Sequence, residues 1–286
     1  MQPDTVPNYQ GFASRRPEWS LPELHAGLQV DDDVVLTDVK GRQCCPNCQK
    51  SRSLYCYDCL VPLTTCPRVE LPFHVSIITD VDEQPSKNTG VQAAILAPGQ
   101  VQLHDLDHCP EFDKERAVVL YPCDTALDIE EVQPDSIDRA FIIDSKWKRA
   151  RRLIKHPAIE GVRRVKLKEH KSAFWRFHTK GVAEEGVCTV EALFFFLNAL
   201  VEKSKLGEAF CGPHCFDNLL WYFSYQHKVV EKAALERVVK KRRQPLIEGK
   251  ENDGKEELNG LNELRADAPS GKRFRLEGGE GEDDRQ

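Results

Sequence analysis

Residues 140–147 read Ala140-Phe-Ile-Ile-Asp144-Ser145-Lys146-Trp147, and this stretch decides the class of fold. Its first four residues form a continuous apolar run, which is typical of a strand buried on both faces of a parallel sheet. A basic segment, Lys146–Lys155, follows directly and is expected to be helical. A buried strand that leads straight into a helix is the unit from which parallel α/β sheets are built.

The same pattern continues in both directions along the chain. A second expected helix, Val190–Ser204, carries apolar residues at helical spacing, and a third runs from an Asp217 cap to about Arg243. Alternating strands and helices predict an α/β fold with a mostly parallel sheet covered by helices. The strands expected from β-rich runs are Phe73–Thr79, Ala93–Leu96, Ala117–Tyr121, Ala140–Ile143 and Val162–Leu167.

Charge is distributed unevenly along the 286 residues. The formal net charge is -6, yet the segment Lys146–Lys171 holds eleven Lys and Arg side chains against Glu160 and Glu169. Local potential, rather than net charge, attracts a phosphate backbone, so this segment indicates RNA contact. A solvated basic face is the ordinary alternative. The candidate RNA-binding residues are Lys146, Arg149, Arg151, Arg152, Arg163, Arg164 and Lys166.

The two ends of the chain lack hydrophobic periodicity. Residues 1–40 and the acidic residues 244–286 are therefore expected to be disordered, leaving a cysteine module at 41–66 and a larger α/β domain at 67–243. No apolar run reaches the length of a membrane span, and the N-terminus lacks the pattern of a secretory signal. We expect no membrane partner, and the oligomeric state is not indicated.

The cysteine module carries a metal-binding spacing. Two pairs with seven residues between them, CxxC-x7-CxxC, indicate zinc, because each turn aims two thiolates at one point. Cys44 is an alternative ligand, although the CxxC register favours its neighbour. Four protein ligands leave no open coordination position, so the zinc would be structural and a zinc-dependent hydrolase is disfavoured. The predicted ligands are Cys45, Cys48, Cys56 and Cys59.

Two loops at strand ends carry residues suited to ligand binding. Asp144 stands at the carboxyl end of a predicted strand, where ligands of open α/β sheets bind. Capping of the next helix by Asp144 or Ser145 and a core position for Trp147 are the alternatives. Pro122 ends the apolar run 117–121, which by itself indicates only a strand stop.

A third loop opens the helix expected from residue 190. Thr189 is a candidate N-cap, and Glu191 lies in the first turn. The Glu191 carboxylate either complements the helix dipole or is held for a cationic or amine-bearing ligand, because a buried charge without a partner is costly.

Together these segments resemble the DTW-domain family of tRNA-uridine aminocarboxypropyltransferases, most closely its eukaryotic members. The resemblance covers about residues 44–232. Two positions depart from the family pattern: Lys146 replaces the motif threonine, and Cys188 stands where related sequences usually have serine. The matching segments are CPNCQKSRSLYCYDCLVPL (45–63), ILAP (95–98), LYP (120–122), IIDSKW (142–147), AFWR (173–176), TVEALFFFL (189–197) and FDNLLWYFSY (216–225).

The resemblance implies a SPOUT-like α/β fold with a trefoil knot, although knots are rare. It implies transfer of the 3-amino-3-carboxypropyl group of S-adenosylmethionine to N3 of a uridine in tRNA, and we take Asp144 as the base. The alternatives are an RNA methyltransferase that uses the same cofactor and a non-catalytic RNA-binding zinc protein. The cofactor-binding residues implied are Pro122, Ser145, Trp147, Thr189 and Glu191.

A basic run near the end of the last expected helix bears on localisation. Lys240-Lys241-Arg242-Arg243-Gln244-Pro245 is typical of a nuclear localisation signal, although basic residues at a helix end also complement its dipole. We expect a nuclear location, with a cytoplasmic pool as a further option.

Overall fold

Within the described residues, six strands form a single parallel sheet. The computed structural model describes residues 27–80, 83–145, 147–168, 170, 172, 187–203, 212 and 214–243, which fall in one compact unit spanning 1–247. The order is β6-β5-β9-β7-β10-β8, and each neighbouring pair is parallel. The bounds are β5 (His74–Thr79), β6 (Val101–His104), β7 (Ala117–Leu120), β8 (Leu127–Asp128), β9 (Arg139–Asp144) and β10 (Arg163–Lys166). The predicted α/β class is confirmed, and the trefoil knot stays a prediction.

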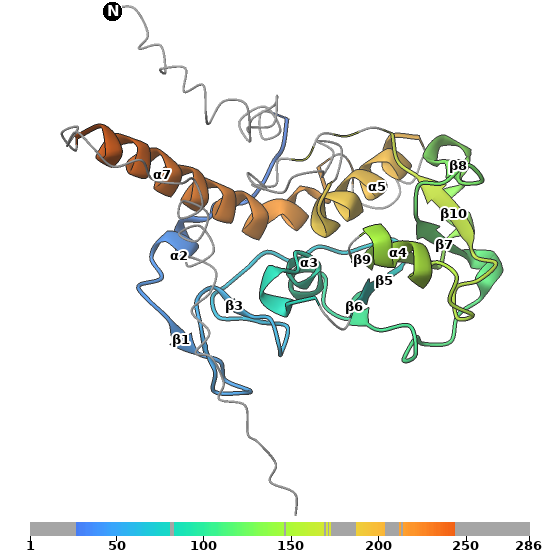
Figure 1. Cartoon of the computed structure of the whole chain (residues 1–286), viewed down its shortest axis with the longest axis horizontal. Helices are drawn as coiled ribbons and strands as arrows, with labels where there is room; N and C mark the ends of the chain where they lie inside the picture. Colours follow the sequence, from blue (N-terminus) through green and yellow to red (C-terminus); the bar gives the residue numbers. More distant parts are fainter. Residues whose placement is uncertain are drawn as a thin grey trace, which may run out of the picture. The chain divides into compact units, whose positions relative to one another are not determined.

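Helices cover the two faces of this sheet. Alternate strand residues point to opposite faces, so Ile77 and Ile142 join a core shared with α3, α5 and α7. Phe141 points the other way, into a core with Ile154 and Ile159 of the segment between α4 and β10, and α4 lies over β9 in Figure 1. The helices are α2 (Val34–Thr37), α3 (Gly90–Leu96), α4 (Trp147–Leu153), α5 (Thr189–Lys203) and α7 (Trp221–Arg243).

Short elements complete the described chain. The cysteine module consists of two small antiparallel hairpins, β1 (Gln43–Cys44) with β2 (Ser51–Arg52) and β3 (Tyr55–Cys56) with β4 (Val61–Pro62). The 3-10 turns are η2 (Pro85–Lys87), η3 (Lys114–Arg116), η4 (Ile129–Glu131), η5 (Pro134–Ser136) and η6 (Asp217–Leu220). Among the described helices, none is long and apolar enough to cross a bilayer.

The strand predicted at Ala93–Leu96 is wrong, because these residues form the second half of α3. Every residue of α3 is buried, so its sequence lacks a polar face and resembles that of a buried strand. The strand that follows β5 is instead β6, which pairs with it from Val75↔Val101 onward.

The prediction of disorder before residue 41 is wrong for residues 27–40. Leu36 is fully buried in the main core, and the backbone N–H of Gln29 donates to Asp217 Oδ2 at 2.6 Å. Asp217 therefore does not cap the last helix, as was expected, because its carboxylate serves this N-terminal segment and His214. The helix itself, predicted to end near Arg243, is confirmed as η6 followed by α7. Residues 1–26 and 244–286 lie outside the described part of the chain.

Gly90→Ala is expected to destabilise the protein by about 1–3 kcal/mol, the usual cost of overpacking a core. A Cβ at this position would lie 2.8 Å from Asn88 Oδ1 and 2.9 Å from Ile77 Cδ1. Urea unfolding should therefore show a lower midpoint. Gly27→Ala is the matched control, because a Cβ there meets no atom within 4 Å; equal midpoints for the two variants would contradict the packing argument.

Candidate functional site

Strand register gathers the predicted loops at one edge of the sheet. Leu120 pairs with both Ile142 and Val165, and Thr79 pairs with Asp144. Because all these strands are parallel, their carboxyl ends meet at the same edge. Asp144 ends the strand between β5 and β7, and Pro122 lies the same number of residues beyond its strand's Leu120 as Asp144 lies beyond Ile142. The structure thus places Asp144, Ser145 and Pro122 at neighbouring strand ends.

Asp80, which the sequence analysis did not single out, binds this segment. Its carboxylate lies directly after β5 and is 6% exposed. Ser145 Oγ donates to Asp80 Oδ2 at 3.1 Å, and a guanidinium nitrogen of Arg149 donates to Oδ1 at 2.7 Å. The rule that identified Asp144, an acidic residue at the end of a predicted strand, applies equally to Asp80. Arg149, predicted to bind RNA, forms an ion pair within the protein.

The Glu191 carboxylate, in the first turn of α5, binds the backbone just before the helix. Glu191 is fully buried and accepts from the backbone N–H of Cys188 at 2.8 Å and from Ser172 Oγ at 2.6 Å. This is half of a capping box, so Cys188, rather than the expected Thr189, occupies the N-cap position. Burial raises the pKa of the Cys188 thiol well above its ordinary value, and the nearby Glu191 carboxylate acts in the same direction. The contacts of Glu191 show a capping role; its predicted role in cofactor binding stays a prediction, as does that of Thr189.

The N-termini of α3 and α5 meet beside the sheet edge. The backbone N–H of Val190 donates to Thr89 Oγ1 at 3.3 Å, and Thr89 directly precedes α3. Gly90, the first residue of α3, packs against Ile77 near the end of β5. The start of α5 is therefore linked, through the start of α3, to the strand that Asp80 follows. Thr89 is a second residue that the sequence analysis did not identify.

Several predicted RNA-binding side chains form contacts within the protein. Arg163 donates to the carbonyl of Ser136 at 2.9 Å, and Lys166 pairs with Asp128 at 3.3 Å. Arg164 lies 3.8 Å from Cys123 Sγ. Arg151 and Arg152, by contrast, are exposed in the last turn of α4. Lys146 lies outside the described residues, and Trp147 is the first residue of α4.

The four predicted zinc ligands come together. One Sγ from each of Cys45, Cys48, Cys56 and Cys59 lies within 4.8 Å of the other three, and Cys48 Sγ is 3.6 Å from Cys56 Sγ. This donor set suits a tetrahedral zinc ion.

The backbone of the two turns has the same unusual conformation. The residue after each second cysteine has a positive φ, 59° at Gln49 and 53° at Leu60, although neither is glycine. Such left-handed positions are costly for ordinary residues and persist where the surroundings impose them. Convergence of the thiols on one ion is a physical reason for both turns.

The pKa values of the Cys45 and Cys59 thiols are shifted in opposite directions. Burial acts to raise the pKa of Cys45. Hydrogen bonds from the backbone N–H groups of Cys48 and Asn47 and from the Cys56 and Cys48 thiols together lower it to about 7. Hydrogen bonding to Cys48, followed by burial, raises the pKa of Cys59 to about 12. A bound zinc ion would favour the thiolate form of Cys59.

The module is docked on the domain through Tyr55. The Tyr55 ring packs edge-on against Tyr222 with centroids 4.8 Å apart. Its hydroxyl accepts from the amide groups of Gln92 in α3 at 3.3 Å and Gln226 in α7 at 3.1 Å. A structural metal would therefore support helices of the main core.

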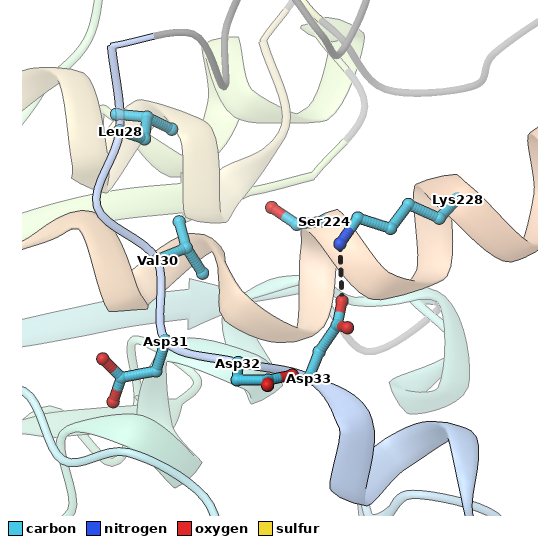
Figure 2. A pocket seen from close by; sticks show the side chains of 7 residues that line it. All are labelled: Leu28, Val30, Asp31, Asp32, Asp33, Ser224 and Lys228. Atoms are coloured by element: carbon cyan, nitrogen blue, oxygen red, sulfur yellow. Dashed lines mark hydrogen bonds and ion pairs between the residues drawn. The ribbon is translucent and has the colours of Figure 1, made fainter.

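A surface pocket lies elsewhere, between residues 28–33 and α7 (Figure 2). Its polar lining includes Asp31, Asp32 and Asp33, and Lys228 Nζ pairs with Asp33 Oδ2 at 2.7 Å. None of the predicted site residues lines it, so this pocket is a crevice beside the N-terminal segment and not the site at the strand ends.

The sheet-edge loops and the four-cysteine module define an α/β protein with a candidate ligand site and a separate candidate metal centre. The family model described as "DTW domain" matches residues 42–231. The chain therefore belongs to the DTW domain family.

Curated relatives align with about three quarters of this chain. The proteins named tRNA-uridine aminocarboxypropyltransferase 1 from Xenopus laevis and Xenopus tropicalis are 26% and 27% identical to it. These alignments cover 74% and 75% of this chain, and 88% and 92% of the relatives. The Homo sapiens protein of the same name is 25% identical, over 68% of this chain and 78% of its own.

A solved structure, titled SAM-dependent rRNA:acp-transferase Tsr3 from Vulcanisaeta distributa, is 21% identical with a TM-score of 0.36. The superposition covers 58% of this chain and 83% of that one.

Purified protein is expected to contain about one zinc ion per chain, because four cysteines complete one tetrahedral site. Cys45→Ser should abolish most of the zinc content measured by elemental analysis, and it should lower the unfolding temperature. Cys44→Ser is the matched control, since its exposed side chain is the immediate neighbour. Loss of zinc from Cys44→Ser with retention in Cys45→Ser would reverse the ligand assignment.

Proposed function

We propose that this chain is a tRNA-uridine aminocarboxypropyltransferase, which transfers the 3-amino-3-carboxypropyl group of S-adenosylmethionine to N3 of a uridine. The observation that carries the proposal is the domain match over residues 42–231. Two curated relatives, 26% and 27% identical, bear this enzyme's name. Asp144 of the IIDSKW segment ends the central strand β9.

The co-substrate supplies the transferred group and a sulfonium leaving group. In the proposed reaction a bond forms between N3 of uridine and the methylene carbon attached to sulfur. The carbon–sulfur bond breaks, its electron pair leaves on methylthioadenosine, and the N3 proton passes to the Asp144 carboxylate. The protein mainly has to align nucleophile, carbon and sulfur, an effect worth roughly 7 kcal/mol at the low end of what good orientation gives.

The remaining residue roles belong to the same proposal. Pro122, Ser145, Trp147, Thr189 and Glu191 are assigned to the cofactor loops by resemblance. Nuclear localisation also stays a prediction. Of the basic run that indicates it, Lys240–Arg243 form the end of α7, and Gln244 and Pro245 lie outside the described residues.

Wild-type protein incubated with unmodified tRNA and S-adenosylmethionine labelled in the aminocarboxypropyl carbons should produce a labelled, heavier uridine and methylthioadenosine. Nucleoside mass spectrometry measures both products. Release of S-adenosylhomocysteine instead would indicate a methyltransferase. Failure to transfer to a full set of tRNAs, with zinc bound, would favour a non-catalytic RNA-binding protein.

Asp144→Asn should reduce turnover by about 10²–10⁴-fold, the range typical of losing a general base. Binding of tRNA, measured separately by filter retention, should stay within about twofold because the proton transfer occurs after binding. Near-normal turnover of Asp144→Asn with normal tRNA binding would remove Asp144 from the role of base.

The double variant Arg151→Ala, Arg152→Ala should weaken tRNA binding and reduce the slope of log affinity against log salt by roughly two, one for each lost phosphate contact. Lys166→Ala is the comparison, because that ammonium already pairs with Asp128. An equal or larger loss for Lys166→Ala would place the RNA on β10 and not on α4.

A further inference from the structure

Both oxygens of one buried carboxylate hold the segment that carries the proposed base. Asp80 Oδ2 accepts from Ser145, the residue after Asp144, and Asp80 Oδ1 accepts from Arg149 one turn further on. Asp80 is therefore linked to the loop after β9 and to the first half of α4. The two contacts lie on either side of Lys146 and Trp147 in the chain.

The backbone adds a third connection at the same place. Thr79 is level with Asp144 in the β5–β9 pairing, and the backbone N–H of Asp80 lies 3.4 Å from the carbonyl oxygen of Asp144. Movement of the loop would separate the strand ends and both side-chain contacts together. A segment held at three points has little freedom to change orientation. A fixed orientation is what a residue that acts as a proton acceptor requires.

Burial makes the carboxylate dependent on these partners. The Asp80 side chain is 6% exposed, whereas that of Arg149 is 36% exposed. A charge in a low-dielectric site needs hydrogen bonds or an opposite charge. Loss of the Asp80 charge would leave the Arg149 guanidinium, which water still reaches. We therefore expect the loss to change the position of the loop after β9 more than the free energy of unfolding.

A second Asp–Arg pair, near the opposite end of β9, provides a comparison. Arg116 binds Asp138 through two contacts, at 2.6 and 2.7 Å. Asp138 precedes β9, at the opposite end of the strand from Asp144. The pair is 46% and 60% exposed, and its partners lie far along the strand from the proposed base. The Arg116–Asp138 pair thus has the same chemistry as the Arg149–Asp80 pair but lies away from the proposed base.

We propose that Asp80 is a positioning residue for the transfer reaction, acting through Ser145 and Arg149 to orient Asp144. This inference rests on the proposed function. It also assigns Arg149 to the internal support of the site and not to the RNA surface. Misplacement of a catalytic group by about 1 Å can cost on the order of 10²-fold in rate.

The central test compares Asp80→Asn with Asp138→Asn. Asp80→Asn keeps the shape of the side chain and removes its charge, so kcat should fall by about tenfold or more while KM for tRNA and the unfolding temperature change little. Asp138→Asn should retain the wild-type kcat. Unchanged kcat in Asp80→Asn would overturn the inference, and so would a loss of kcat that only follows a loss of folded protein.

Variants of Arg149 distinguish a role in positioning Asp144 from a role in RNA contact. Arg149→Met should lower kcat, and Arg149→Lys should restore part of it because the opposite charge beside Asp80 is retained. An RNA-contacting arginine would instead raise KM for tRNA and reduce its salt dependence. That second pattern would overturn the assignment of Arg149 to Asp80.

Hydrogen exchange keeps the test independent of activity. In Asp80→Asn, backbone amides of the peptide covering residues 144–153 should exchange faster than in wild type, and those of Asp138→Asn should not. If wild-type protein transfers no group, the proposed function fails while faster exchange still supports the anchoring by Asp80. Unchanged exchange in this peptide contradicts the anchoring whether or not the protein is active.

Discussion

The pairing of β9 with two parallel neighbours is the constraint on which the rest of the structure depends. Ala140 and Ile142 face one core and Phe141 the other, so the strand must be apolar throughout and its register cannot slip without exposing a core residue. The same register sets Asp144 level with Thr79. From that alignment follow the nearness of Asp80 to Ser145 and the direction in which α4 leaves the sheet. A packing requirement thus determines where the chemistry of the site can be.

Sequence patterns predicted the strands and helices whose spacing of apolar residues matches the faces that are buried. The strands β5, β7, β9 and β10 and the helices α4, α5 and α7 were visible because their apolar runs or helical spacings match their surroundings. Helix α3 was mistaken for a strand since all its faces are buried. The four cysteines were found from spacing because two short turns encode the site locally. Asp80 stands at the end of a predicted strand, as Asp144 does, but its bonds to Ser145 and Arg149 depend on residues distant in the chain. Thr89 and the contacts of residues 27–37 also depend on distant partners, and no local pattern reports them.

The cysteine module and the sheet-edge site share structural support. Tyr55 of the module binds Gln92 in α3, and Thr89, just before that helix, accepts from Val190 of α5. One short helix therefore connects the module with the loop that opens α5. A metal bound only by cysteines has no open position for reactants; its contribution to the site would pass through the placement of α3.

The N-terminal segment has a consequence for the order in which the chain can complete its fold. Gln29 meets Asp217 and Lys228 meets Asp33 across 188 and 195 residues of sequence. Contacts between such distant residues close a very large loop. They slow folding because the chain loses the entropy of loop closure before these contacts stabilise it. During synthesis, residues 28–37 leave the ribosome long before α7 exists. Their contacts with Asp217 and Lys228 cannot form until α7 has been synthesised, so α7 completes the packing of the N-terminal segment.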